Sequence, residues 1–295
     1  MMSEFEVRIV TVDAFTKCRF GGNPAAVILE CQEIPEGFYQ PIANEINLAQ
    51  TVFVEQISPD FFKLDFYTPN AQLSYSGHAT LGAFYVLADT GYIRPLENGV
   101  KSVHALMIDK TVLEIKISYE GYKVSNVAIL CPKPRVNKEF KHTINKDLVR
   151  KILKIGSNSI LDVVVGGCFQ DDIFVLVDNK ETLYSIKPDP WVLKSINFST
   201  RTQGLFAFTD EIKGNATHSY ARYFSPLYGI PEEIATATAA VYAGNMLLIK
   251  SGEKHIDIYQ GQNMHRPSKV EVDNIDDQLW VSGVGRLVTD GIMKI

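Results

Sequence analysis

Hydrophobic and polar positions along the chain predict the same order of elements twice. Alternating apolar and polar residues indicate strands, and apolar residues three or four positions apart indicate helices. In the first half this pattern predicts strands at 7–12, 26–29, 51–54, 62–67, 111–118 and 122–130, and helices at 38–47 and 78–88. In the second half it predicts strands at 161–165, 173–177 and 204–208, and helices at 146–155, 189–196 and 235–248. The mixture is typical of an α+β fold.

A proline pair interrupts this pattern near the middle of the chain. Pro132 and Pro134 lack the backbone N–H that a central strand needs. We therefore place a boundary there, with an N-terminal lobe at 1–130 and a C-terminal lobe at 131–278. A final strand at about 279–295 is expected to return to the first lobe. The 295 residues suit two domains of ordinary size.

One local match suggests that the two lobes arose by duplication. Phe66-Tyr67-Thr68-Pro69 resembles Tyr223-Phe224-Ser225-Pro226, and each precedes a short loop and a helix rich in alanine and threonine. A chance match is the alternative. If the duplication is real, the two helices begin at one cleft between the lobes.

Composition and charge narrow the range of partners. Hydrophobic residues make up 46% of the chain and charged residues 21%, which is typical of a globular protein. The net charge is −5, and no basic stripe is present to bind a nucleic acid. The apolar run 79–88 is too short to span a membrane, which takes about 20 residues. With no signal peptide at the start, we expect a cytoplasmic protein.

The start of the helix at 78–88 carries the candidate chemistry. A helix N-terminus presents free amide groups and partial positive charge, which favours a carboxylate. The small Gly77 and Ala79 allow a ligand to approach, as Ala237 does in the second lobe, where Thr238 can donate a hydrogen bond. His78 in the first turn can bind an anion or shuttle a proton near neutral pH, whereas a structural histidine is the alternative.

Other residues offer less. The remaining histidines have no such setting and are interpreted as surface or loop residues: His104, His142, His218, His255 and His265. The four cysteines lie far apart, without a C-x-x-C pair, so neither a metal site nor a disulfide framework is expected.

Six motifs in order resemble the PhzF-like family of phenazine-biosynthesis-type isomerases, which share the diaminopimelate-epimerase fold. They are 12–16 (VDAFT), 22–27 (GNPAAV), 42–48 (IANEINL), 76–82 (SGHATLG), 222–226 (RYFSP) and 260–262 (QGQ). The resemblance implies two similar lobes, each a mixed or antiparallel sheet curled around a central helix, with the site in the cleft between them. It also implies a homodimer, proton transfer without a cofactor on a small carboxylate-bearing molecule, and a binding role for Asn23 in the second motif.

The chain departs from the family pattern at the residues that would handle protons. The family has glutamate as its main acid/base where this chain has Gln50, which cannot take up or release a proton. The family has a second signature that corresponds to residues 232–239 here. In this segment Glu233 replaces the family's aspartate, Ala237 replaces glycine and Thr238 replaces serine. The acidic residue before the Gly-His motif appears as Gln72.

Two functional hypotheses follow from these departures. The first is an isomerase or epimerase with Glu233 as the acid/base, His78 assisting and Gln50 orienting the substrate. The second is a non-catalytic protein that keeps the cleft and binds a small anion or another partner. A dimeric scaffold is a third possibility, for which the sequence indicates no surface patch. The fold alone does not decide between these functions.

Overall fold

The computed structural model describes residues 6–140, 143–211 and 217–295, which form two compact units. The first unit runs to Leu130 and includes Ser282–Ile295, and the second runs from Cys131 to Val281. Each unit is described by itself. Of the histidines, His142 lies outside the described residues. No helix within these described ranges has both the length and the apolar character needed to cross a membrane.

From Glu6 onward, the first unit consists of a mixed sheet and two α-helices. Its strands are β1 (Glu6–Ala14), β2 (Asn23–Leu29), β3 (Gln50–Ser58), β4 (Phe61–Tyr67), β5 (Gln72–Leu73), β6 (Asn98–Leu106), β7 (Val112–Glu120), β8 (Lys123–Cys131) and β18 (Gly285–Lys294). Hydrogen bonding gives the order β18-β1-β2-β3-β4-β6-β7-β8, with β5 beside β4. Helix α1 (Tyr39–Ile46) connects the parallel pair β2 and β3, and α2 (Gly77–Asp89) precedes β6, which is parallel to β4.

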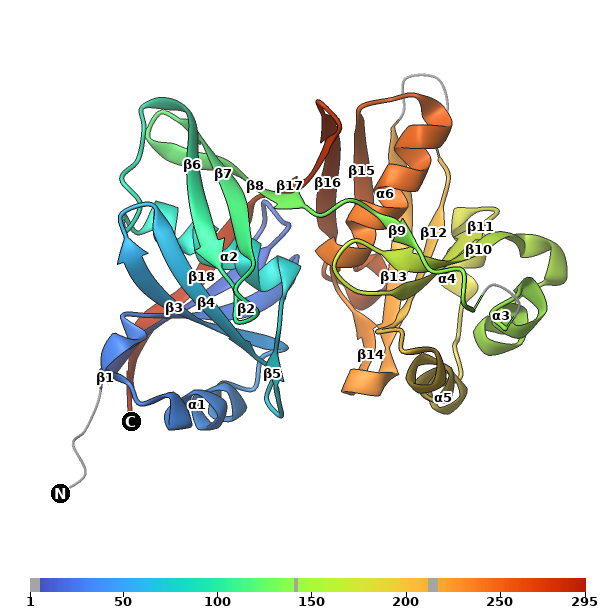
Figure 1. Cartoon of the computed structure of the whole chain (residues 1–295), viewed down its shortest axis with the longest axis horizontal. Helices are drawn as coiled ribbons and strands as arrows, with labels where there is room; N and C mark the ends of the chain where they lie inside the picture. The colour runs from blue at the N-terminus through green and yellow to red at the C-terminus, as the bar shows by residue number, and fades with distance from the viewer. Residues whose placement is uncertain (1–5, 141–142, 212–216) are drawn as a thin grey trace. The chain divides into compact units, whose positions relative to one another are not determined.

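Helix α2 is the central element of the first unit. Every residue from Gly77 to Ala88 is buried, as expected for a helix that is apolar on all sides. The helix contacts β1, β2, β3, β7 and β18, so the sheet curls around it (Figure 1). Close packing at Gly82 explains the tight fit, because an added Cβ would lie 2.8 Å from Cγ1 of Val12.

The described part of the second unit contains a second mixed sheet and four α-helices. Its strands are β9 (Arg135–Val136), β10 (Ile160–Gly167), β11 (Asp172–Val177), β12 (Leu205–Thr209), β13 (His218–Ser225), β14 (Ile230–Glu233), β15 (His255–Gln260) and β16 (Ser268–Ile275), followed by β17 (Gln278–Gly283). Its helices are α3 (Lys146–Leu153), α4 (Lys180–Ser185), α5 (Pro190–Thr200) and α6 (Ala237–Ser251). Short 3-10 turns lie at Cys31–Glu33 and Glu36–Phe38 in the first unit, and at Ser157–Ser159, Pro226–Tyr228 and Gln262–Met264 in the second.

The pairing pattern of the first unit recurs in the second. Strands β1 to β4 pair in the sequence antiparallel, parallel, antiparallel, and so do β10 to β13. The short strand β5 pairs with β4, the strand before α2, and β14 pairs with β13, the strand before α6. In each unit the next long strand after the helix, β6 or β15, is parallel to the strand before the helix. Helix α6 contacts β10, β15 and β16 and therefore corresponds to α2. The repeated topology favours duplication over a chance match.

The predicted fold class is confirmed: the chain is α+β, with a sheet around a central helix in each of two similar units. Some boundaries differ. The helix predicted from 235 begins at Ala237, because Thr236 has the extended backbone of an N-cap, and it ends at Gly252 in the left-handed region. Strands β5, β6, β9, β14, β15 and β16 and helix α4 were not predicted, and the helix from 189 extends to Thr200.

Candidate active site

Two candidate residues of the first unit lie at the start of neighbouring strands. Asn23 begins β2 and Gln50 begins β3. These strands are parallel, and Gln50 is paired with Ala25, two residues after Asn23. The turn before Asn23 requires glycine, because Gly22 has φ 59° and an added Cβ would lie 2.2 Å from the carbonyl oxygen of Ala14. The fold thus brings Asn23 and Gln50 to the same edge of the sheet.

The Gln50 side chain is buried without full hydrogen bonding. Only 6% of the residue is exposed. Within the described residues, no donor reaches its Oε1 atom. Leaving a buried amide oxygen unsatisfied costs about 1–3 kcal/mol, so this group has the capacity to accept a hydrogen bond from a ligand. The geometry is suited to orientation of a ligand and supplies no proton transfer.

The start of α2 is held by its own cap. Ser76 is the N-cap, and its Oγ atom accepts a hydrogen bond from the amide of Ala79 at 3.4 Å. The backbone carbonyl of Ser76 accepts bonds from the amide and the hydroxyl of Thr80, at 3.0 and 2.6 Å. The backbone amide of Ala79 is used by this cap, so a binding role for Ala79 depends on its small side chain, which leaves room for a ligand. Gly77 is buried beside it.

His78 follows in the first turn of α2 and is almost completely enclosed. Its exposed fraction is 3%, and burial lowers the pKa of the imidazole to about 3. Gly82 lies one turn later on the same helix face and is close to Val12 of β1. At neutral pH the ring is uncharged. This favours hydrogen bonding over the proton shuttle near neutral pH, and it equally suits a structural histidine.

In the second unit Glu233 lies at the end of β14, and a hydrogen-bond network joins it to the start of α6. Thr236 donates its hydroxyl to Oε2 of Glu233 at 2.7 Å, and its amide donates to Oε1 of Gln260 at 3.1 Å. The Gln260 Nε2 group donates to the backbone carbonyl of Glu233 at 2.9 Å. This network holds the half-buried Glu233 carboxylate beside the helix N-terminus, where partial positive charge stabilises an anion.

The two helix residues after Thr236 complete this group. Ala237 is buried and Thr238 is half-buried. Thr236 occupies the N-cap position, as Ser76 does, yet its side chain does not cap the helix, and its hydroxyl donates to Glu233 instead. The structure therefore brings Glu233, Ala237 and Thr238 together at one helix start.

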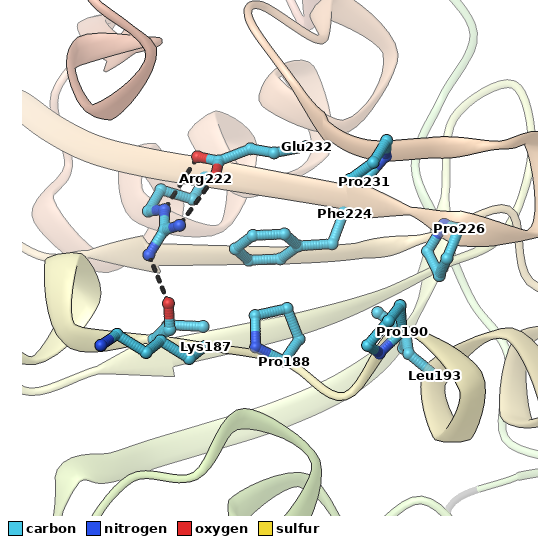
Figure 2. A pocket seen from close by; sticks show the side chains of 10 residues that line it. Lys187, Pro188, Pro190, Leu193, Arg222, Phe224, Pro226, Pro231 and Glu232 are labelled. Carbon is cyan, nitrogen blue, oxygen red and sulfur yellow. Dashed lines mark hydrogen bonds and ion pairs between the residues drawn. The ribbon is translucent and has the colours of Figure 1, made fainter.

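The preceding glutamate has a structural role. Glu232 forms a two-point ion pair with Arg222, at 2.8 Å to Nε and 2.7 Å to Nη2. Arg222 also donates to the carbonyls of Leu183 and Ile186, at 3.1 and 2.8 Å, and its guanidinium lies 4.8 Å from the centre of the Phe224 ring. Figure 2 shows this pair above Phe224, at the edge of a pocket of about 260 Å³ that is lined by Pro188 and other prolines. Glu232 is thus committed to Arg222.

Sequence reasoning missed a second carboxyl group near Glu233. Asp172 begins β11, is 1% exposed, and accepts a hydrogen bond from the hydroxyl of Tyr223 at 2.9 Å. Burial raises the pKa of Asp172 to about 8. Tyr223 is in turn the cross-strand partner of Glu233. Before folding, these residues lie on three separate segments, and no motif marks Asp172. An aspartate beside the apolar run 173–177 is the only signal that the sequence offers.

His255 is a second residue whose environment the sequence did not reveal. Its Nδ1 lies 2.7 Å from Asp273 and its Nε2 lies 3.2 Å from Asp257. Hydrogen bonds to Asp257 and Asp273 raise the pKa of the imidazole to about 10. The residue lies on β15, half exposed, and its ion pairs stabilise the sheet.

Comparison with known proteins assigns this chain to one family. The family model described as "Phenazine biosynthesis-like protein" matches residues 12–291. A phenazine biosynthesis-like domain-containing protein of Bos taurus is 26% identical over 298 residues, covering 97% of this chain and 98% of that protein. YfhB of Bacillus subtilis, named an uncharacterized isomerase, is 25% identical over 275 residues, covering 91% of this chain and 90% of its own.

Solved structures agree with this assignment at the level of the fold. The crystal structure of the Bacillus anthracis phenazine biosynthesis protein of the PhzF family superposes with a TM-score of 0.83 at 21% identity, covering 99% of this chain and all of that one. A hydroxyproline epimerase from Agrobacterium vitis, solved with bound trans-4-hydroxy-L-proline, has a TM-score of 0.63 at 10% identity, covering 100% of this chain and 92% of that one. The fold is therefore shared by PhzF-type proteins and by epimerases.

Proposed function

Since the chain belongs to the phenazine biosynthesis-like protein family of isomerases and epimerases, we propose that it moves a proton on a small carboxylate-bearing metabolite without a cofactor. The observation that carries the proposal is the carboxylate of Glu233 at the start of α6, which accepts a hydrogen bond from the Thr236 hydroxyl while Gln260 holds the Glu233 backbone carbonyl. A general base must be held in place and must reach its substrate. Glu233 is half-buried, which meets both conditions.

The proposed reaction uses Glu233 as the single acid/base. Its carboxylate removes a proton from a carbon next to a carboxyl or an unsaturated group, the acid that forms exchanges its proton with solvent, and it then protonates the substrate at a different position. Gln50 cannot replace Glu233, because a side-chain amide neither accepts nor releases a proton near neutral pH. A positioned acid/base contributes about 10²–10⁴-fold to a rate, so losing the glutamate at position 50 leaves a slower enzyme with one proton-transfer group.

The other residues bind and orient in this proposal. The neutral imidazole of His78 and the carboxamides of Gln50 and Asn23 form hydrogen bonds with the substrate. In each unit the N-terminal turn of the main helix, α2 or α6, favours a carboxylate, with Gly77, Ala79 and Ala237 leaving room and Thr238 donating a hydroxyl. The bound trans-4-hydroxy-L-proline of the Agrobacterium vitis epimerase makes small amino and imino acids the first compounds to test.

Solvent exchange provides the test. The protein is incubated in deuterium oxide with a set of small carboxylic, amino and imino acids, and deuterium incorporation at carbon is measured by mass spectrometry and proton NMR. We expect exchange of at least one acid by the wild type, a loss of about 100-fold or more for Glu233→Gln, and a smaller loss for His78→Ala. Glu45→Gln is the matched control, because Glu45 is exposed on α1. Exchange that persists in Glu233→Gln contradicts the assigned role.

Gln50 also supports a second candidate function, a binding protein without turnover. Its buried carboxamide keeps the shape of a glutamate and the capacity to accept a hydrogen bond. The variant Gln50→Glu separates the two functions. Isomerase activity that appears only in Gln50→Glu indicates an enzyme that has lost its chemistry, whereas calorimetry that finds equal ligand binding without turnover in both forms supports the binding protein. A homodimer stays a prediction, which sedimentation equilibrium tests.

A further inference from the structure

The buried pair Asp172–Tyr223 lies next to the proposed acid/base and has no part in the mechanism above. Tyr223 reaches from β13 over β12 to the start of β11. This path passes over Gly204, where an added Cβ would lie 2.5 Å from Cζ of the Tyr223 ring and 2.6 Å from its hydroxyl. The hydroxyl then donates to Asp172 at 2.9 Å. A glycine at position 204 is therefore what permits the contact.

The same tyrosine adjoins Glu233. Tyr223 and Glu233 are direct cross-strand partners in the antiparallel pair β13 and β14. Side chains at such positions start about 5 Å apart on one face of the sheet. The charge of Glu233 acts on both Asp172 and Tyr223 and raises the pKa of each, after the larger effect of burial. Asp172, Tyr223 and Glu233 thus form one electrostatic group.

The surroundings keep Asp172 uncharged at neutral pH. Its pKa is raised to about 8, first by burial. The Tyr223 hydroxyl and the backbone of Gly204 favour the ionised form through hydrogen bonds, and the acidic neighbours Glu233 and Asp171 oppose it. The neighbouring Asp171 forms an ion pair with Arg135 at 3.1 Å. Tyr228, in the 3-10 turn after β13, also faces Asp172.

We propose that Asp172 and Tyr223 form a positioning pair that controls the proton state of Glu233, an inference that rests on the proposed role of Glu233 as the acid/base. While Asp172 is neutral, Glu233 is the one member of the two carboxyl groups that carries charge, as a base requires. When Asp172 ionises, a second negative charge makes Glu233 hold a captured proton more strongly and return it more slowly. The two carboxyl groups titrate as a coupled pair.

The experiment observes the carboxyl groups directly and needs no substrate. The full chain is labelled with carbon-13 at the carboxyl groups of aspartate and glutamate, and their chemical shifts are followed with pH. In the wild type we expect one aspartate resonance to titrate near pH 8 and to be missing from Asp172→Asn. In Glu233→Gln its midpoint falls by about half a pH unit or more, and in Tyr223→Phe it rises. Glu271→Gln, which alters an ion pair with Lys269, is the control and leaves the midpoint unchanged.

In the titration, two results overturn the inference: titration of Asp172 below about pH 5, or the same midpoint in the wild type and in Glu233→Gln. The wild-type titration and Tyr223→Phe decide the matter even if Asp172→Asn does not fold.

Deuterium exchange supplies the separate readout of function. A wild-type inflection near pH 8 that Asp172→Asn lacks supports the pair. Exchange with the same pH profile in both proteins refutes the pair and leaves the isomerase proposal intact. Coupled titration without exchange of any acid refutes the isomerase proposal alone.

Discussion

The burial of His78 predicts a pH-dependent stability that its replacement removes. The imidazole is 3% exposed at the start of α2. Burial lowers its pKa in the folded protein to about 3, whereas an unfolded histidine has a pKa of about 6.5. The perturbation is His78→Gln, which keeps a neutral polar side chain of similar length and removes the titrating group.

The sign and size follow from proton binding. Because the pKa of the folded state lies below that of the unfolded state, the unfolded chain binds the proton first as the pH falls. The contribution of His78 to stability is complete above about pH 6.5 and is lost progressively toward pH 3. At about pH 5 the loss reaches about 2 kcal/mol, and near pH 3 about 4 kcal/mol.

Urea unfolding followed by far-UV circular dichroism measures this at about pH 8 and about pH 5. The free energy of unfolding of the wild type should fall by about 2 kcal/mol more than that of His78→Gln between these conditions. The raised pKa values of Asp172 and His255 act in the opposite direction, but both proteins share them, so the difference isolates His78. His104→Gln, at an exposed position of β6, is the control.

The reasoning is refuted if the wild type and His78→Gln change in parallel, within about 0.5 kcal/mol. That result means that His78 carries its proton in the folded protein at about pH 5. A charged imidazole also removes the argument for a neutral hydrogen-bonding role in the candidate site.

Two further predictions concern charged groups of the second unit. Glu232→Gln leaves the Arg222 guanidinium buried beside a neutral amide, so it should lower the free energy of unfolding by about 3 kcal/mol in denaturant titrations. Glu271→Gln, in a more exposed ion pair, is the control and should cost less than about 1 kcal/mol. Equal losses in the two variants contradict this prediction. His255→Gln should lower stability at neutral pH, because the pKa of His255 is raised in the folded state. That contribution is complete below about pH 6.5 and disappears as the pH rises through about 10, so thermal melts of the two proteins should converge in alkali; a constant difference contradicts it.

Elements with a strong local pattern followed from the sequence. Alternation in 62–67 and 111–118 predicted β4 and β7, and helical spacing in 38–47 predicted α1. Strand β6 was missed, because its residues 98–102 are largely exposed or half-buried and carry weak alternation. The helix α6 was predicted two residues early, since alanine and threonine at 235–236 do not show by themselves where a cap lies.

For the candidate site too, the sequence predicted some features and the structure added others. Family-like motifs gave Asn23, Gln50, His78 and Glu233, because these residues sit in short segments whose order is visible along the chain. The structure added what those residues contact: the cap by Ser76, the hold of Thr236 on Glu233, and the enclosure that lowers the pKa of His78. Their roles in binding and catalysis stay predictions.

By itself the sequence determined the α+β pattern, the repeated order of elements and the identity of the side chains that can handle protons. Those properties are local, since they depend on residue type and on spacings of a few positions. Only the tertiary structure decided that Asp172, Tyr223 and Glu233 form one group. Strands β11, β13 and β14 had to come together, with the Tyr223 ring over Gly204, before the Asp172 carboxyl was buried. Burial and electrostatic coupling depend on distance in space, and the sequence order does not contain that distance.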